Sequence, residues 1–334
     1  MSDSITVIQV GLGALGRRLT PFLLERPSLQ LVGAVDPHPD LAGRDLGEVA
    51  GLGRHLGLEI VPDLWEPFSA GQVDVALQTT VSSLSAAALQ IQDLLHCGAH
   101  VVSSCEELSY PWQTEPYLAA EIDRQARAAG RAVLGVGVNP GFLMDFLPLA
   151  LTAICRQVRK VTVLRYQDAR ARRLPFQRKI GAGLSPEQFD ARKADGSLRH
   201  VGLIESMHMI ASRLGWTLDR TQDTVEPIIA EQRVASDDIT VEPGQAAGVR
   251  QLGLGFVSGE EKIRLDFRAS LGEPDVQDTV IIDGDPPLRF TVPDGVNGDI
   301  ATCALLTNAI PSIIDAEPGL RTMADLPPIT WSAE

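Results

Sequence analysis

The sequence predicts an α/β protein with a doubly wound parallel sheet, followed by an α+β domain whose sheet is mostly antiparallel. In the first 145 residues, short runs of Val, Ile, Leu and Ala alternate with helical patterns, as in parallel sheets covered by helices on both faces. Later runs are longer and alternate with polar residues, which is typical of a sheet with one covered face. A length of 334 residues agrees with about two domains.

The first region contains five apolar runs separated by amphipathic patterns. We expect strands at Ile5–Val10, Leu29–Val35, Val73–Gln78, His100–Ser103 and Ala132–Val136. We expect helices over Ala86–Leu95 and Pro116–Ala129 and, on one helical face, around Leu15, Leu19, Phe22 and Leu23. These repeated strand–helix units favour a doubly wound sheet.

The second region, residues 146–296, has runs with more alternation, separated by turn residues such as Ser258 and Gly259. We expect strands at Val158–Gln167, Leu218–Ala230, Gly248–Val257, Glu261–Ser270 and Val276–Asp283. We expect helices at Pro186–Ala194 and Leu203–Leu214. This part is interpreted as a substrate-binding and dimerisation domain of a homodimer. The segment 297–334, with a helix at Gly298–Ile314, is expected to pack back on the first domain.

Composition excludes several classes of function. A net charge of −14 disfavours nucleic acid and anionic membranes as partners. The four cysteines, none of them in a C-x-x-C pair, predict no metal site and reduced thiols in a cytoplasmic protein. The apolar stretch 131–156 is interrupted by Asn139, Pro140, Asp145 and Pro148, so we expect a buried strand and helix there and not a membrane span.

A Gly-rich segment follows the first expected strand and opens the first expected helix. In this setting the first glycine makes the tight turn, the second lets the backbone approach a pyrophosphate, and the third allows close helix–strand packing. The helix N-terminus then faces the phosphates. We therefore predict a Rossmann dinucleotide-binding domain over residues 1–145. Its loop is Gly11, Leu12, Gly13, Ala14, Leu15 and Gly16.

Residues at other strand ends complete the predicted cofactor site. Asp36 lies 20 residues after Gly16 (36 − 16), a spacing that suits the ribose hydroxyls of NAD and disfavours the extra phosphate of NADP. NAD is therefore favoured, with NADP possible. Ligands of such sheets bind at the carboxyl ends of the strands. This adds Thr79, Thr80, Ser103, Asn139 and Pro140 as cofactor-binding candidates, with the next helix starting at Pro140 and Gly141.

Two adjacent acids, Glu106 and Glu107, follow the strand that ends at Ser103. A carboxylate beside a nicotinamide suits a reaction in which the substrate becomes a cation, as when an amine is oxidised to an iminium. Adjacent residues at a strand end point in opposite directions, so only one of the two is expected in the site. The alternative is that both acids merely cap the helix that follows.

Three stretches together resemble a known family. They read Cys-Glu-Glu-Leu-Ser-Tyr-Pro at 105–111, Gly-Val-Asn-Pro-Gly-Phe-Leu-Met-Asp at 137–145 and Leu-Gly-Trp-Thr-Leu at 214–218. They are similar to the 2,4-diaminopentanoate dehydrogenases, which include native NAD(P)-dependent amine dehydrogenases of dihydrodipicolinate-reductase-like architecture. The resemblance implies reversible oxidative deamination of an amine, or reductive amination of a ketone or aldehyde with ammonia. It also implies a catalytic glutamate in the first stretch, which we assign to Glu106.

Other functions stay open at this point. Cys105 could serve as the nucleophile of a semialdehyde dehydrogenase, but that chemistry needs a His base, and no His is obviously placed. A reductase of a carbonyl or cyclic imine on the same scaffold is the main alternative. The basic His-His and Lys-x-x-x-x-Ser-Gly-Thr segments of dihydrodipicolinate reductase itself are missing from the sequence. A non-catalytic dinucleotide sensor is the third hypothesis.

The segment 156–179 holds nine basic residues and one acid, Asp168. These cations either capture a substrate carboxylate or form ion pairs with acidic neighbours or across a subunit interface. The family has a polar, often Asn-containing stretch where this chain reads Arg165-Tyr166-Gln167-Asp168, which leaves diaminopentanoate itself in doubt as the substrate. The candidate pocket residues are Phe142, Met144, Tyr166, Gln167, Met207 and His208.

Overall fold

The computed structural model describes residues 4–332. The chain forms two compact units. The first unit contains the residues up to Phe142 and those from Asn297 onward, and the second unit contains Leu143–Val296. The chain therefore passes from one unit to the other twice, after Phe142 and after Val296.

The first unit is built on a seven-stranded sheet with the strand order β15-β6-β5-β4-β1-β2-β3. All neighbouring strands pair in parallel. Six of the strands have the order of the dinucleotide-binding Rossmann fold, with β1 beside β4 at the point where the strand order reverses. The strands are β1 Ile5–Val10, β2 Leu29–Val35, β3 Ile60–Val61, β4 Val75–Gln78, β5 His100–Ser103, β6 Ala132–Gly135 and β15 Gly319–Arg321.

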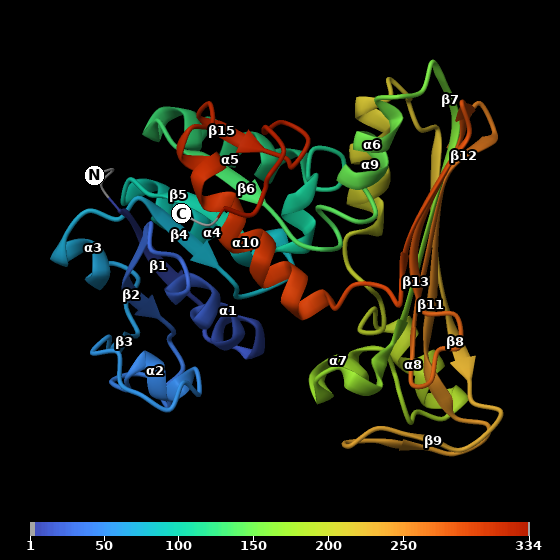
Figure 1. Cartoon of the computed structure of the whole chain (residues 1–334), viewed down its shortest axis with the longest axis horizontal. Coiled ribbons are helices and arrows are strands. Elements are labelled where there is room, and N and C mark those ends of the chain that lie inside the picture. Colours follow the sequence, from blue (N-terminus) through green and yellow to red (C-terminus); the bar gives the residue numbers. More distant parts are fainter. Residues whose placement is uncertain (1–3, 333–334) are drawn as a thin grey trace. The chain divides into compact units, whose positions relative to one another are not determined.

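Helices cover both faces of this sheet (Figure 1). The helices α4 and α5 pack against each other, and α10 packs against α1, so the end of the chain completes the layer begun by its first helix. In α4 the buried residues recur every three to four positions, as Leu84, Ala87, Ile91 and Leu95. The helices are α1 Ala14–Leu24, α2 Leu46–Val49, α3 Glu66–Ala70, α4 Leu84–His96, α5 Pro116–Ala129 and α10 Gly298–Ile314, with a 3-10 turn η1 at Glu106–Ser109.

The second unit has a six-stranded sheet in the order β14-β13-β7-β12-β11-β8. Its neighbouring strands pair antiparallel except for β7 and β12, which are parallel. The strands are β7 Gln157–Asp168, β8 Arg220–Ile229, β11 Ala246–Val257, β12 Glu260–Ser270, β13 Gln277–Asp285 and β14 Leu288–Pro293, with a separate pair β9 Val234–Ala235 and β10 Thr240–Val241. The helices are α6 Phe146–Thr152, α7 Leu174–Lys179, α8 Pro186–Ala194 and α9 Leu203–Arg213, with a 3-10 turn η2 at Ala169–Ala171.

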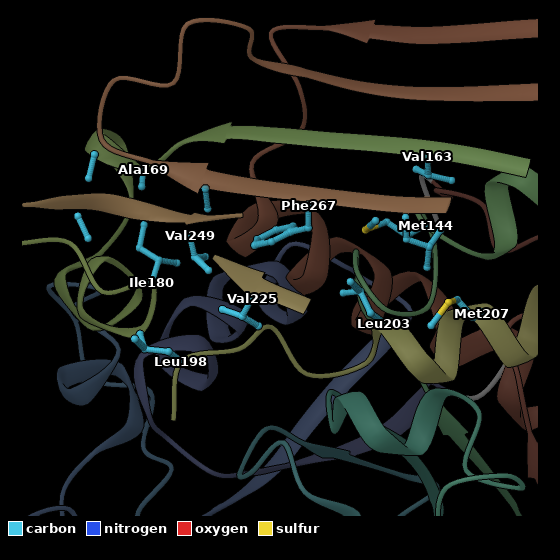
Figure 2. Packing of buried hydrophobic residues seen from close by; sticks show 14 of the residues in the cluster. Met144, Val163, Ala169, Ile180, Leu198, Leu203, Met207, Val225, Val249 and Phe267 are labelled. Carbon is cyan, nitrogen blue, oxygen red and sulfur yellow. The ribbon is translucent and has the colours of Figure 1, made fainter. Parts of the chain in front are cut away.

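The helices of the second unit lie on one side of its sheet (Figure 1). Between them and the strands is a single apolar core, in which Met207 and Leu203 of α9 pack with Val163 and Phe267 of the sheet (Figure 2). Alternate residues of the strands point into this core, so the intervening ones form the open face of the sheet.

The fold class expected from the sequence is confirmed, and the differences lie in short elements. The strand expected from Val73 begins at Val75. The helix expected to start at Pro140 begins instead at Phe146, because residues 139–145 form turns. Single-sequence patterns also missed elements that are six residues long or shorter, namely α2, α3, α7, β3, β9, β10, β14 and β15. Among the described residues, no helix has the length and apolarity needed to cross a bilayer.

Candidate active site

In the loop between β1 and α1, close packing requires glycine at positions 11 and 16 but not at position 13. A Cβ on Gly11 would lie 2.8 Å from the carbonyl oxygen of Thr79. A Cβ on Gly16 would lie 2.0 Å from the carbonyl oxygen of Gly11, so no larger residue fits there. A Cβ on Gly13 would meet nothing within 4 Å. The glycine at position 13 therefore leaves open space beside the backbone, as expected where a phosphate approaches.

The first turn of α1 provides the donors for that phosphate. Gly13 is the N-cap residue, and the helix has no side-chain cap and no acid in its first turn. The N–H groups of the first turn, which includes Ala14, Leu15 and Gly16, have no partner within the helix. An uncapped helix N-terminus attracts anions through these groups and the helix dipole. The loop thus fits the pyrophosphate of NAD(P).

Asp36, at the end of β2, is held next to this loop. Its Oδ2 accepts the N–H of Leu12 at 2.7 Å, and its Oδ1 accepts the N–H of His38 at 2.9 Å. The Leu12 carbonyl accepts a hydrogen bond from Arg17 Nε at 2.9 Å. The carboxylate is fixed but only half-buried, and carboxylate oxygens have further lone pairs for ribose hydroxyls.

The threonines after β4 and the serine that ends β5 differ in exposure. Thr79 is buried, and its hydroxyl donates to the Gly11 carbonyl at 2.8 Å. Thr80 is exposed, with its hydroxyl 3.1 Å from Gln90 Oε1. Ser103 is buried and donates to Gln78 Oε1 at 2.8 Å. Thr79 and Ser103 therefore support the ends of the strands, while Thr80 is open to solvent.

Glu106 and Glu107 have different surroundings, although they are neighbours in the turn η1. One carboxylate oxygen of Glu107, Oε2, accepts the N–H of Leu84 at 2.8 Å and so caps α4; the helix has no cap from its own N-cap residue, Ser83. The turn lies against the end of β6, where a Cβ on Gly135 would be 2.6 Å from the backbone of Leu108. This close packing fixes the turn that carries Glu106, which is half-buried.

Cys105 is not suited to act as a nucleophile. Its side chain is 2% exposed, and its thiol lies 3.2 Å from the Ser82 carbonyl. Burial, reinforced by the nearby Glu106 and Glu107, raises the pKa of the thiol to about 12. The reactive form of a cysteine is the thiolate. With a pKa this high, very little of Cys105 is a thiolate at neutral pH. The geometry thus argues against the semialdehyde dehydrogenase hypothesis.

The turns after β6 carry the remaining cofactor candidates. Asn139 is buried and is joined to Pro140 by a cis peptide bond. The neighbouring N–H of Val138 donates to Thr302 Oγ1 of α10 at 3.3 Å. The last part of the chain therefore supports the segment that holds Asn139.

The pocket candidates are divided between the two units. Phe142 ends the first unit and is half-buried. In the second unit, Met144 is fully buried in the apolar core with Met207 (Figure 2). His208 is half-buried, and burial lowers the pKa of its imidazole. Met144 and Met207 thus pack in the core, while Phe142 and His208 keep partial exposure.

The polar candidates of β7 point to opposite faces of the sheet. Tyr166 is 7% exposed and donates to Asp266 Oδ2 at 3.3 Å. Gln167 is 8% exposed, and its Oε1 accepts from Arg172 Nη1 at 2.8 Å. Successive strand residues alternate between faces, and Gln167 pairs in register with Ala269 of the core. Gln167 therefore lies on the helix-covered face and Tyr166 on the open one.

Most of the basic segment is paired with acids of the second unit. Arg165 Nη1 lies 2.7 Å from Asp278 Oδ1, and burial lowers the pKa of this guanidinium while Asp278 opposes the shift. This pairing agrees with the expectation that the basic residues form ion pairs with acidic neighbours. The other pairs are Arg156 with Asp285 at 2.7 Å, Arg159 with Asp283 at 2.6 Å, Lys160 with Glu261 at 2.5 Å and Arg170 with Asp168 at 2.5 Å.

His200 is a candidate that the sequence did not single out. It packs on Phe267 with ring centroids 4.7 Å apart, and its backbone N–H donates to Gln251 Oε1 at 2.6 Å. Burial and the cations Lys179 and Arg165 lower the pKa of its imidazole to about 3. A strongly shifted pKa is a known mark of functional sites. Because the cations come from distant parts of the sequence, no local pattern predicted this environment.

Comparisons with known proteins show which family the chain resembles. The C-terminal domain family of 2,4-diaminopentanoate dehydrogenase matches residues 142–333. A 2,4-diaminopentanoate dehydrogenase of Acetoanaerobium sticklandii is 34% identical over 97% of this chain and 94% of the relative. An amine dehydrogenase of Streptomyces virginiae is 25% identical over 97% of this chain and 96% of the relative.

A solved structure supports the same fold over the whole chain. The amine dehydrogenase from Mycobacterium smegmatis superposes with a TM-score of 0.88 at 24% identity, covering 100% of this chain and 99% of the other. The resemblance inferred from the short stretches is confirmed by the relative that is 34% identical over 97% of this chain. The chain belongs to the 2,4-diaminopentanoate dehydrogenase family.

Proposed function

We propose that the protein is an NAD(P)-dependent amine dehydrogenase that uses Glu106 as its catalytic carboxylate. It deaminates a small amine oxidatively and, in reverse, aminates a ketone or aldehyde with ammonia. The assignment to Glu106 depends on the different surroundings of the two acids in the turn η1. Glu107 caps α4 through the Leu84 N–H at 2.8 Å, which favours its neighbour for the chemistry.

The first unit is the cofactor-binding domain in this proposal. The N–H groups of the α1 first turn hold the pyrophosphate, with Gly13 leaving room for it. Asp36, fixed by the Leu12 N–H at 2.7 Å, accepts the ribose hydroxyls and favours NAD over NADP. Thr80 and Asn139 contact the ribose and nicotinamide part, while Thr79, Ser103 and Pro140 shape the wall. When bound, NAD(P) supplies the hydride acceptor or donor.

Glu106 performs three proton-handling steps in the direction of deamination. Its carboxylate first takes a proton from the substrate ammonium, because only the neutral amine can release hydride. It passes this proton to solvent, and the regenerated carboxylate then stabilises the iminium cation that hydride loss creates. Finally it accepts a proton from the water that attacks the iminium carbon, and the adduct breaks its C–N bond to release ammonia and the carbonyl product.

The second unit is the substrate-binding domain in this proposal. Gln167 and His200 lie on the helix-covered face of its sheet, and Phe142 and His208 are half-buried candidates for the wall. Lys179, one of the cations that lower the pKa of His200, favours a substrate that carries a carboxylate away from the amine. A plain small amine is the alternative substrate class.

We also propose a cytoplasmic homodimer. The open face of the six-stranded sheet joins two copies in this proposal. Strands about 4.8 Å apart and about ten residues long give a face of roughly 800 Å², which matches one side of a standard protein interface. Half-buried Leu164, Leu252 and Leu254 lie on this face among Arg264 and other charges. The cytoplasm is favoured because Cys97, Cys105, Cys155 and Cys303 are free thiols.

A panel assay tests the reaction class. Short ketones, aldehydes and keto acids are offered with ammonia, and oxidation of NADH and NADPH is recorded in separate reactions. We expect ammonia-dependent oxidation, faster with NADH, for at least one carbonyl compound. Oxidation that proceeds equally well without ammonia would make the protein a carbonyl reductase and overturn the proposal.

Two matched variants test the assignment of the carboxylate. Glu106→Gln is expected to lower kcat by roughly 10²- to 10⁴-fold and to leave the Kd of NADH within about twofold. Glu107→Gln removes a negatively charged helix cap, so it should lower the stability by roughly 1 kcal/mol and retain most of the turnover. The opposite pattern of activities would assign the chemistry to Glu107.

A further inference from the structure

The two places where the chain passes between the units are built differently. After Phe142 the chain continues directly into α6, whose N-cap Asp145 accepts the N–H of Phe146 at 2.7 Å and the hydroxyl of Ser206 at 2.8 Å. After Val296 it continues into α10 of the first unit. We call residues 295–297 the return connection. Its anchorage in the second unit uses a buried ion pair.

That ion pair joins the neighbouring strands β7 and β13. Arg165 is 1% exposed and Asp278 is 5% exposed. Arg165 Nη1 donates to both oxygens of Asp278, at 2.7 and 2.8 Å. Two buried charges at this distance satisfy each other. Asp278 also sits directly opposite Arg165 in the register of the two strands, so the pair needs no distortion of the sheet.

Both members of the pair also bind the backbone of Val296. The N–H of Val296 donates to Asp278 Oδ2 at 2.8 Å, and the carbonyl of Val296 accepts from Arg165 Nη2 at 3.3 Å. The residue is thus held at its donor and its acceptor at once. Gly295, just before it, has a φ of +64°, a left-handed turn that brings the chain out of β14.

The next residues lead directly to the proposed cofactor site. Asn297 caps α10 by accepting the N–H groups of Asp299 and Ile300 at 3.0 and 3.2 Å. One turn later, Thr302 accepts the N–H of Val138 at 3.3 Å. Hydrogen bonds therefore connect the ion pair to Val296, the next residue Asn297 to the start of α10, and Thr302 of α10 to Val138, which precedes Asn139.

We propose that Arg165 and Asp278 are positioning residues that fix the return connection and thereby the start of α10. This rests on the proposed function only for its effect on turnover. Neither residue needs to touch substrate or cofactor. Their role is to keep Val296 at one place, so that the first turn of α10, which accepts the N–H of Val138 through Thr302, starts from a fixed point.

A second ion pair on the same two strands provides the matched control. Arg159 of β7 and Asp283 of β13 lie 2.6 Å apart. Their side chains are 46% and 58% exposed, and the Arg159 guanidinium donates to Asp283 Oδ1 and to the Gly284 carbonyl. This pair bridges the same strands without touching the return connection.

The experiment compares three variants of the full chain with wild type. Arg165→Met/Asp278→Leu removes both charges together, which avoids an uncompensated buried ion. Arg159→Met/Asp283→Leu is the control, and Asp278→Asn is a milder change that keeps an acceptor near Val296. The readouts are amide hydrogen exchange at Val296 and the first turn of α10, the Kd of NADH, and kcat and KM with a carbonyl compound and ammonia.

We expect the Arg165/Asp278 double variant to exchange the Val296 amide at least about tenfold faster. Its kcat should fall by roughly 10²-fold, since a misplacement of about 1 Å has that effect on a reaction. KM and the Kd of NADH should change by less than about threefold. The control should match wild type, and Asp278→Asn should lie between the two in both exchange and kcat.

Two results would overturn the proposal. One is unchanged exchange at Val296 in the double variant or, if that variant does not fold, in Asp278→Asn. The other is faster exchange with wild-type kcat. The exchange measurement needs no substrate. If the wild type shows no turnover with any amine, the proposed function fails while the anchoring of the return connection is still decided.

Discussion

The two sheets of this protein use polar residues in opposite ways. In the first unit the polar groups of the proposed site follow the strands, as Asp36 follows β2 and Glu106 follows β5. In the second unit the charged residues lie within the strands and face one another, as Arg165 faces Asp278 across β7 and β13. The first arrangement leaves polar groups at one edge, whereas the second neutralises them.

The difference shows why a count of charges is a poor guide to a binding site. Nine basic residues in the segment 156–179 suggested an anion site. Five of them are engaged by acids, three of which (Asp278, Asp283 and Asp285) belong to a strand more than 100 residues later. In the first unit, a single acid at a strand end is a better indication of a binding site than a count of charges, because parallel strands bring all their carboxyl ends to one edge.

The largest expected effect concerns the two ion pairs of the second unit. Arg165→Met leaves Asp278 buried without its partner, so we expect a loss of about 3–5 kcal/mol in the free energy of unfolding. Arg159→Met removes an exposed pair and should change it by less than about 1 kcal/mol. Urea denaturation measures both. Equal effects would mean that burial does not distinguish the two pairs.

The second largest effect is expected at His100, which lies at the amino end of β5, whereas Glu106 follows the carboxyl end of this strand. His100 is 5% exposed, and its Nδ1 accepts the N–H of Ala132 at 3.2 Å. Burial, assisted by Arg131, lowers the pKa of this imidazole from 6.5 to about 4. The unfolded chain therefore binds a proton at a pH where the folded chain does not.

Stability should accordingly fall as the pH drops from about 6.5 to about 4. The contribution of His100 is roughly 3 kcal/mol over this range, and it becomes constant below pH 4, where both states are protonated. The pKa of His200 is shifted in the same direction, so His100→Asn is needed to isolate the effect. Unfolding curves of the variant should depend less steeply on pH, and parallel curves for both proteins would refute the assignment.

The third prediction tests the open space beside Gly13. A Cβ there meets no atom within 4 Å, so Gly13→Ala should change the stability by less than about 1 kcal/mol. The added methyl group occupies the space assigned to the pyrophosphate, and the Kd of NADH should rise by roughly tenfold or more. Fluorescence titration with NADH measures this, and an unchanged Kd would move the phosphate away from Gly13.

The smallest effect is expected at Asp36. Asp36→Asn keeps a hydrogen-bond acceptor near the Leu12 N–H but removes the negative charge. The preference for NADH over NADPH, measured as the ratio of kcat/KM values, should fall by roughly fivefold to tenfold, because one repulsion with the extra phosphate is lost. A ratio that stays constant would show that the preference has another origin.

The sequence alone determined the fold class and predicted the sheet edge at which the cofactor is proposed to bind. Both follow from local rules, since the Gly11–Gly16 loop, the strand before it and Asp36 lie within 36 residues and act through backbone geometry. The pair Glu106 and Glu107 was also visible, because it directly follows an apolar run. A resemblance in short stretches was enough to identify the family.

Only the tertiary structure decided what each charged side chain does. The amide that Glu107 caps lies 23 residues earlier, and Asp278 is 113 residues after Arg165. No local pattern specifies such partners, because they depend on strand order and register. For the same reason, the sequence did not predict the environment of His200 or the hydrogen bonds that hold Val296. The partners of both residues come together only when β7, β12 and β13 are assembled.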